Sequence, residues 1–183
     1  MHRNWRKPEF IARAHSGTTY GSAVHAVLQY IRYEACADTD SVKAEIRRLV
    51  DESYITPEQG AMVDAAALAK FFQTSLGSKL RTSQQVLREF KFSILDDASQ
   101  YGDGLEGEHV LLQGVVDCAL VEPDGITVVD FKTDYVTKDT IDEVTQGYRP
   151  QVETYADALR RIFGQPIKEK ALYYFHIGDF RWL

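Results

Sequence analysis

The stretch Val128–Asp134 reads VVDFKTD and places charged residues inside an apolar run. Side chains alternate along a β-strand, so Asp130 and Lys132 project from the same face. A buried charge is costly unless it is paired or binds a metal. The pattern leaves two interpretations open: a strand that ends in a solvated ion pair, which stabilises little, or a strand that presents a reactive site.

The residues before this stretch indicate a β-hairpin. The expected strands are His109–Val121 and Ile126–Lys132, joined by the turn Glu122–Gly125. If Val121 pairs with Ile126, then Asp117 lies opposite Asp130 on the same face. Two facing carboxylates destabilise a sheet unless a cation lies between them. Because carboxylates hold Mg²⁺ well, the hairpin predicts a divalent-metal site.

Hydrophobic spacing and capping residues predict the other elements. Helices are expected at Thr18–Ala35, at Ser41–Glu52, from Thr56 to near Gly77, at Ile141–Tyr148 and at Pro150–Phe163. Further strands are expected at Val86–Leu95 and Lys170–Ile177, and an irregular lead-in at residues 1–16. This order predicts one α/β (α+β) domain over residues 1–183. Its mixed central sheet contains a three-strand meander, is flanked by helices and carries extra helices at the N-terminal end.

Composition limits the possible functions. The chain has 183 residues and a formal net charge of −6, which argues against broad nonspecific binding to nucleic acid. No run approaches the ~18 apolar residues of a membrane span, so no membrane partner is expected. Cys36 and Cys118 form no CxxC pattern, so an iron–sulfur cluster is not expected, and two isolated cysteines fit a reducing cytosol.

Several motifs resemble those of one enzyme family. The set Asp117…Asp130-Phe131-Lys132 resembles the D…(D/E)xK signature of the PD-(D/E)xK nuclease superfamily, and GVVDCAL…ITVVDFKTD is similar to its RecB-type branch. That branch also has a helical G-x-x-x-H motif, an acidic residue in its first core strand and a QxxxY motif. The matching segments here are Gly17–His25, Glu89 in REFKF, and Gln151–Tyr155. Their order is similar to the C-terminal nuclease domain of AddA-type helicase–nucleases.

The resemblance implies a role for each matching residue. His25, Asp117, Asp130 and the Phe131 carbonyl would hold the metal, Lys132 and Glu89 would complete the catalytic set, and Gln151 and Tyr155 would contact DNA. The metal would be Mg²⁺, with Mn²⁺ as a substitute. No Walker motif is present, so no nucleotide site is expected, and the chain would be a nuclease domain separated from a longer helicase–nuclease.

The resemblance further implies a metal-dependent deoxyribonuclease of the bacterial cytoplasm. It would digest single-stranded DNA exonucleolytically as helicase domains of the same chain deliver it, together with an AddB-like partner, in double-strand-break repair and recombination. Two alternatives stay open. One is an inactive nuclease fold that serves as a DNA-binding or scaffold module, and the other is a stand-alone endonuclease, which would also cleave circular single strands.

Simpler interpretations of individual residues also stay open. His25 lies one residue from the apolar stripe of its helix and would then be a packed histidine. Glu89 would be solvated, and Tyr155 would belong to the apolar face of its helix. His109 and His176 are expected to be structural.

Overall fold

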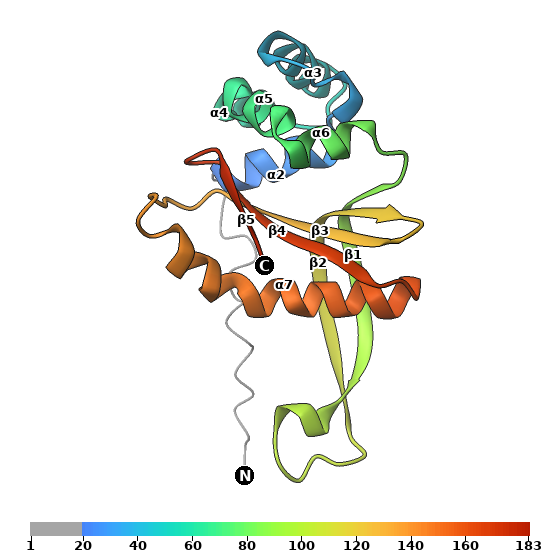
Figure 1. Ribbon diagram of the computed structural model, residues 1–183. Coiled ribbons are helices and arrows are strands. Elements are labelled where there is room, and N and C mark those ends of the chain that lie inside the picture. Colours follow the sequence, from blue (N-terminus) through green and yellow to red (C-terminus); the bar gives the residue numbers. More distant parts are fainter. Residues whose placement is uncertain (1–19) are drawn as a thin grey trace.

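The structure is a computed structural model that describes residues 20–183. The expected lead-in at 1–16 and the first two residues of the first expected helix lie outside this range. A five-stranded sheet has helices on both faces (Figure 1). Its strands, in spatial order, are β1 (Val86–Asp97), β2 (His109–Glu122), β3 (Gly125–Lys132), β4 (Ile167–Tyr174) and β5 (Asp179–Trp182). Only β3 and β4 pair in parallel, which confirms the expected mixed sheet with its three-strand meander.

The β2 strand has ladders of unequal length on its two sides. Its pairing with β1 runs from Leu120 to His109. Its pairing with β3 includes the expected Val121–Ile126 pair but stops at Cys118–Val129. Beyond that pair, β1 and β2 continue as a long hairpin while β3 diverges from them (Figure 1). The resulting fork begins at Asp117.

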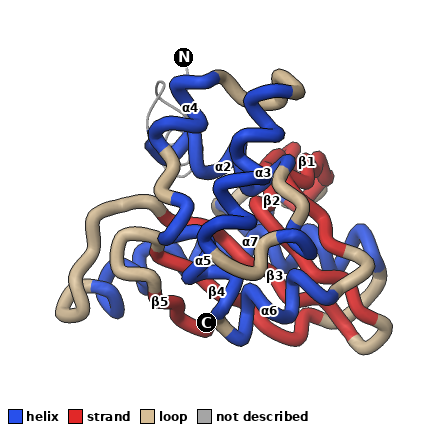
Figure 2. The backbone as a smooth tube through the Cα atoms, turned by 90° about the horizontal axis from the view of Figure 1, so that it is seen from above, coloured by secondary structure: helices blue, strands red, loops and turns tan. Residues whose placement is uncertain are grey.

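Five α-helices form a layer over one face of the sheet (Figure 2). They are α2 (Tyr20–Tyr30), α3 (Thr39–Asp51), α4 (Pro57–Met62), α5 (Ala65–Gln73) and α6 (Ser75–Thr82). Apolar side chains of α2, α3, α5 and α6 share a core with Cys118, Val129 and Phe131 of the sheet, whereas α4 has no buried residue. On the other face, α7 (Ile141–Phe163) packs over a second core that includes Val116 and Val128. The sheet is therefore buried on both sides around the fork.

Several predicted boundaries were wrong for identifiable reasons. The helix expected from Thr56 to Gly77 is three helices, because Asp64 and Thr74 each cap a new N-terminus with a side-chain oxygen. The helix expected to end at Ala35 instead ends at Tyr30 and is followed by a separate 3₁₀ turn.

The C-terminal elements also differ from expectation. Pro150 was expected to separate two helices but lies inside the single helix α7. Pro150 is exposed, and the buried apolar face of α7 continues on both sides of it, which offsets the lost backbone hydrogen bond. The last expected strand begins at Ile167 rather than Lys170 and is followed by β5, which was not predicted.

Candidate metal and catalytic centre

Side chains and backbone from four separate segments meet at the fork. His25 of α2 places Nδ1 3.3 Å from Oε1 of Glu89 on β1 and 3.5 Å from Oδ1 of Asp117 on β2. Its Nε2 lies 3.2 Å from the carbonyl oxygen of Phe131 on β3. Ligand atoms of His25, Glu89 and Asp117 all lie within 4.8 Å of one another. We call these three side chains, with the Phe131 carbonyl, the fork cluster.

Glu89 reaches this cluster through a local distortion of β1. The β1–β2 ladder pairs Arg88 with Cys118 and Phe90 with Val116, and the position between these pairs is that of Glu89 and Asp117. Glu89 has a φ of +46°, a left-handed conformation that is unfavourable for a glutamate. Strain of this kind persists where the surrounding structure imposes it, and here it directs an acidic side chain toward His25.

Asp117 joins the two strands where their ladder ends. Its Oδ2 accepts a hydrogen bond of 2.8 Å from the backbone N–H of Phe131, while its Oδ1 faces His25. One carboxylate therefore fixes the distance between β2 and the β3 carbonyl that lies in the cluster. The last backbone pair between the described parts of β2 and β3 is Cys118–Val129, so at Asp117 the link between the two strands is made by a side chain.

The fork cluster has an excess of negative charge. Burial opposes a charge on His25, but the hydrogen bond to Glu89 and the charges of Asp117, Glu89 and Asp130 raise the pKa of His25 to about 9. Burial, followed by the charge of Asp130, raises the pKa of Asp117 to about 7. Neighbouring carboxylates contribute to both increases, whereas burial raises the pKa of Asp117 and opposes the rise at His25.

Asp130 and Lys132 lie beside the fork cluster, on the face that α7 covers. Asp130 is 2% exposed, and its Oδ2 has no hydrogen-bond donor within the described part of the chain, although Lys132 Nζ lies 2.7 Å away as an ion pair. Lys132 donates to Gln151 Oε1 at 2.9 Å, and the Gln151 amide nitrogen donates to the Tyr155 hydroxyl, also at 2.9 Å. The lysine also lies 3.8 Å from the centre of the Tyr148 ring.

The residues at the fork suit a divalent cation. A cation would relieve the repulsion between the carboxylates and could draw on the Asp130 oxygen that lacks a hydrogen-bond donor. The donor atoms are carboxylate and carbonyl oxygens with one imidazole nitrogen, and no thiolate is among them. Oxygen donors are what Mg²⁺ and Mn²⁺ prefer, and the imidazole favours Mn²⁺ somewhat. The cysteines Cys36 and Cys118 are buried and form no disulfide.

The family model of the PD-(D/E)XK nuclease superfamily matches residues 2–181 of this chain. The chain is a member of the PD-(D/E)XK nuclease superfamily. Its mixed sheet with helices on both faces is the fold expected from that resemblance.

Three relatives are each named as the A subunit of an ATP-dependent helicase/nuclease. The Acetivibrio thermocellus protein is 36% identical over 181 residues, which are 94% of this chain and 14% of that protein. The Thermoanaerobacter sp. protein is 36% identical over 163 residues, covering 87% of this chain and 13% of its own length. The Clostridium novyi protein is 31% identical over 181 residues, or 95% of this chain and 15% of its own. This PD-(D/E)XK chain thus spans about one seventh of these curated relatives.

The nuclease motifs expected from the sequence converge in space, but their arrangement differs in detail. Glu89, expected to complete the catalytic set, lies among the atoms suited to bind a metal. Asp130, expected as a ligand, turns its Oδ2 toward Lys132. Gln151 and Tyr155, expected at the DNA, form a hydrogen-bonded chain behind that lysine.

Two residues that support this centre were not anticipated. Tyr148 lies three residues before Gln151, so helical spacing could have placed it on the same face of α7. Arg88 donates to the carbonyls of Ile31 and Gln29 at the end of α2, and lies over the Tyr33 ring. In the sequence, Arg88 is notable only because it interrupts the apolar face of the expected strand Val86–Leu95.

Within residues 20–183, no helix combines the length and the apolar character needed to span a lipid bilayer.

Proposed function

We propose that this domain hydrolyses phosphodiester bonds of DNA with a divalent metal ion, Mg²⁺ or in its place Mn²⁺. The observation that carries the proposal is the convergence of His25, Glu89, Asp117 and the Phe131 carbonyl from four segments, beside a partly buried lysine. His25, Glu89, Asp117 and that carbonyl hold the ion, with Asp130 as a further donor. When bound, the ion supplies a water of lowered pKa and positive charge at the scissile phosphate.

The chain itself supplies the positioning of Lys132. The ammonium group is held between Asp130 and Gln151, so it enters the site in one orientation. There it orients the attacking water or stabilises the charge that develops on the phosphate. The buried position of Asp130 keeps bulk water from screening this charge.

We further propose that the domain works inside a helicase–nuclease. The relatives named as parts of a helicase/nuclease are about seven times longer than the matched segment, which leaves room for helicase domains in the same chain. In this setting, single strands delivered by the helicase are digested exonucleolytically during repair and recombination, with an AddB-like protein as partner. Residues 1–183 would then form one nuclease domain of that larger protein.

A cleavage assay on end-labelled linear and circular single-stranded DNA tests these proposals. We expect digestion of linear DNA with Mg²⁺ or Mn²⁺ and none with Asp117→Asn. Asp103→Asn, in the exposed loop between β1 and β2, is the matched control and should cleave normally. Absence of cleavage and of metal binding would favour an inactive scaffold, and cleavage of circular DNA would favour an endonuclease.

A further inference from the structure

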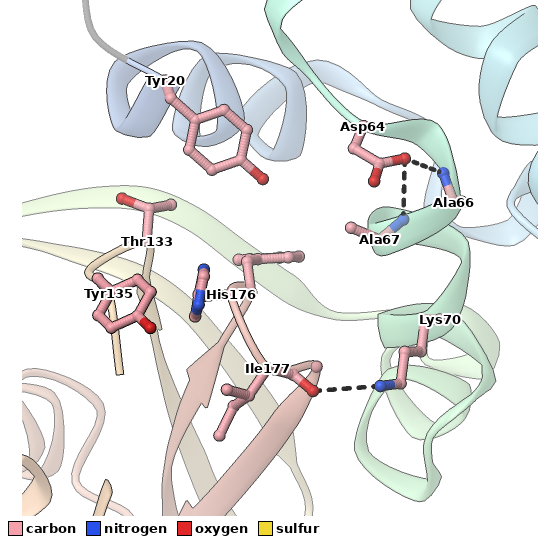
Figure 3. A pocket seen from close by; sticks show the side chains of 11 residues that line it. Tyr20, Asp64, Ala66, Ala67, Lys70, Thr133, Tyr135, His176 and Ile177 are labelled. Carbon is pink, nitrogen blue, oxygen red and sulfur yellow. Dashed lines mark hydrogen bonds between the residues drawn. The ribbon is translucent and has the colours of Figure 1, made fainter. Parts of the chain in front are cut away.

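A pocket of about 540 Å³ opens where β3 and β4 end (Figure 3). We call it the aromatic pocket, because aromatic side chains from three segments border it: Tyr20 at the start of α2, Tyr135 after β3, and Phe175 and His176 after β4. It is an open pocket whose volume is large enough to admit a nucleobase.

The aromatic pocket adjoins the proposed catalytic centre along the chain. Thr133, which borders it, directly follows Lys132 and lies two residues beyond Phe131. Two residues of an extended chain, such as Phe131 to Thr133, span about 7 Å. This is about the length of two nucleotides in a stacked DNA strand. Phe175, also on the pocket wall, donates its backbone N–H to the Lys132 carbonyl at 2.9 Å.

Charged groups at the pocket are already partnered inside the protein. Asp64 accepts hydrogen bonds from the backbone of Ala66 and Ala67 and so caps the N-terminus of α5. Lys70 donates to the carbonyl of Ile177. Figure 3 shows both sets of bonds at the rim. The two charges offset each other, and the capped helix end offers no cradle for a phosphate.

The remaining surface suits a flat, uncharged ring. Tyr135 is 76% exposed and packs against His176, with ring centres 4.3 Å apart and ring planes tilted by 49°, so the pair presents exposed aromatic surface to solvent. Tyr20 stands on the opposite side of the pocket in Figure 3. Aromatic platforms bind bases of single strands because every base has a π face. The hydroxyl groups of Tyr20 and Thr133 supply donors and acceptors for the polar edge of a base.

We propose that the aromatic pocket holds one unpaired base of the DNA strand whose phosphodiester lies at the fork cluster, with Tyr135 and His176 as its stacking platform. This inference rests on the proposed nuclease function and adds a reason for single-strand selectivity. A paired and stacked base in a duplex cannot enter the pocket without being flipped out, so the platform favours strands whose bases are already free.

The test compares substrates and variants at low salt. End-labelled oligo(dT) strands are used intact or with one abasic residue moved stepwise along the strand. With wild type we expect one abasic position to raise KM about 5- to 150-fold, the range measured for loss of one stacked base. Tyr135→Ala and His176→Ala should raise KM for intact DNA similarly and should abolish the extra effect of that abasic position.

Controls separate stacking from folding. Tyr135→Phe keeps the ring and should restore the sensitivity to that abasic position that Tyr135→Ala loses. Tyr101→Ala removes an exposed tyrosine outside the pocket and should keep the wild-type KM. Since Tyr135 is largely exposed, its alanine variant should melt as wild type does. An abasic effect that persists unchanged in Tyr135→Ala, or the lack of any such position in wild type, would overturn the proposal.

Binding is also measured by fluorescence anisotropy of labelled oligo(dT) with Ca²⁺ in place of Mg²⁺. This readout does not require cleavage, so it tests the pocket even if the wild-type chain hydrolyses no DNA. Weaker binding by Tyr135→Ala but not by Tyr101→Ala supports the pocket. Equal binding by these two variants and wild type contradicts it, whatever the outcome of the cleavage assay.

Discussion

Lys132 donates a hydrogen bond of 2.9 Å to the side-chain oxygen of Gln151, which links β3 to α7. Gln151 in turn donates to Tyr155, a residue that is 7% exposed and packs edge-on against Phe92. The glutamine is thus placed to hold the lysine, whereas the sequence motif predicts that it contacts a DNA strand. The two roles have different kinetic consequences.

If Gln151 positions Lys132, Gln151→Ala should lower kcat about 10- to 100-fold with little change in KM. A hydrogen bond to a charged group contributes about 1.5–3 kcal/mol, and each 1.4 kcal/mol of the barrier is a factor of ten. Steady-state cleavage of single-stranded DNA measures both constants. A rise in KM at unchanged kcat would instead show that Gln151 serves to bind the strand.

Asp117→Asn, Asp130→Asn and Lys132→Met should each abolish cleavage and leave the fold intact. Asp117→Asn removes one of several crowded negative charges, so without metal it should melt no lower than wild type, whereas Asp130→Asn also removes the ion pair with Lys132 and should melt lower. Cleavage assays and thermal melting in a chelator measure the two effects. Lys43→Met, on the exposed surface of α3, is the control for the lysine. Full activity in any of the three site variants would refute the assignment.

Divalent cations should stabilise the wild-type domain. At a concentration 100 times Kd, binding adds about 2.7 kcal/mol to the free energy of unfolding, or roughly 5–11 °C in Tm for a chain of this size. His25→Ala should require more Mn²⁺ for the same rise. If His25→Ala instead loses much of its Tm without metal and Mn²⁺ restores nothing, His25 is a packing residue.

Arg88 connects α2 to β1 one residue before Glu89. Its guanidinium lies 3.8 Å from the centre of the Tyr33 ring and donates to backbone carbonyls at the end of α2. Arg88→Ala should lower the free energy of unfolding by about 2–4 kcal/mol, from lost charged hydrogen bonds and the cation–π contact. Because α2 carries His25, it should also weaken metal binding, measured by calorimetry.

Arg88→Lys keeps the charge but loses the planar fork of donors, so we expect it to recover only part of the stability. Unchanged metal affinity in Arg88→Ala, at temperatures where that variant is folded, would show that the contact serves the fold alone.

The net charge predicts the affinity of the isolated domain for DNA. At −6, an isolated domain gains little from counterion release and should bind DNA weakly and with strong sensitivity to salt. Tethering to helicase domains replaces affinity with a high local concentration of the strand. Cleavage by the 183-residue chain should therefore be much weaker than by a fusion with those domains. Tight binding of the isolated chain to duplex DNA at physiological salt would contradict this.

Local sequence patterns predicted part of this site. The Val121–Ile126 register is as predicted, and the 2.7 Å ion pair of Asp130 with Lys132 agrees with their predicted common face, but the ladder stops at Cys118–Val129, one pair before Asp117 and Asp130. The position of Glu89 could not be derived in this way, because its left-handed backbone breaks the alternation on which strand reasoning depends. The link from Arg88 to α2 joins residues more than fifty positions apart, which no local pattern encodes.

Phe131 belongs to two environments at once. Its ring packs among Phe71 and Phe175, at centre distances of 5.2 and 5.8 Å, while its carbonyl oxygen faces His25. Every amino acid carries that carbonyl, so no codon change at this position can delete it. A substitution at position 131 can only shift the carbonyl oxygen, because it changes how the side chain packs against its neighbours. The position of this carbonyl therefore depends on the packing of the core, whereas a single base change can remove one of the acidic side chains.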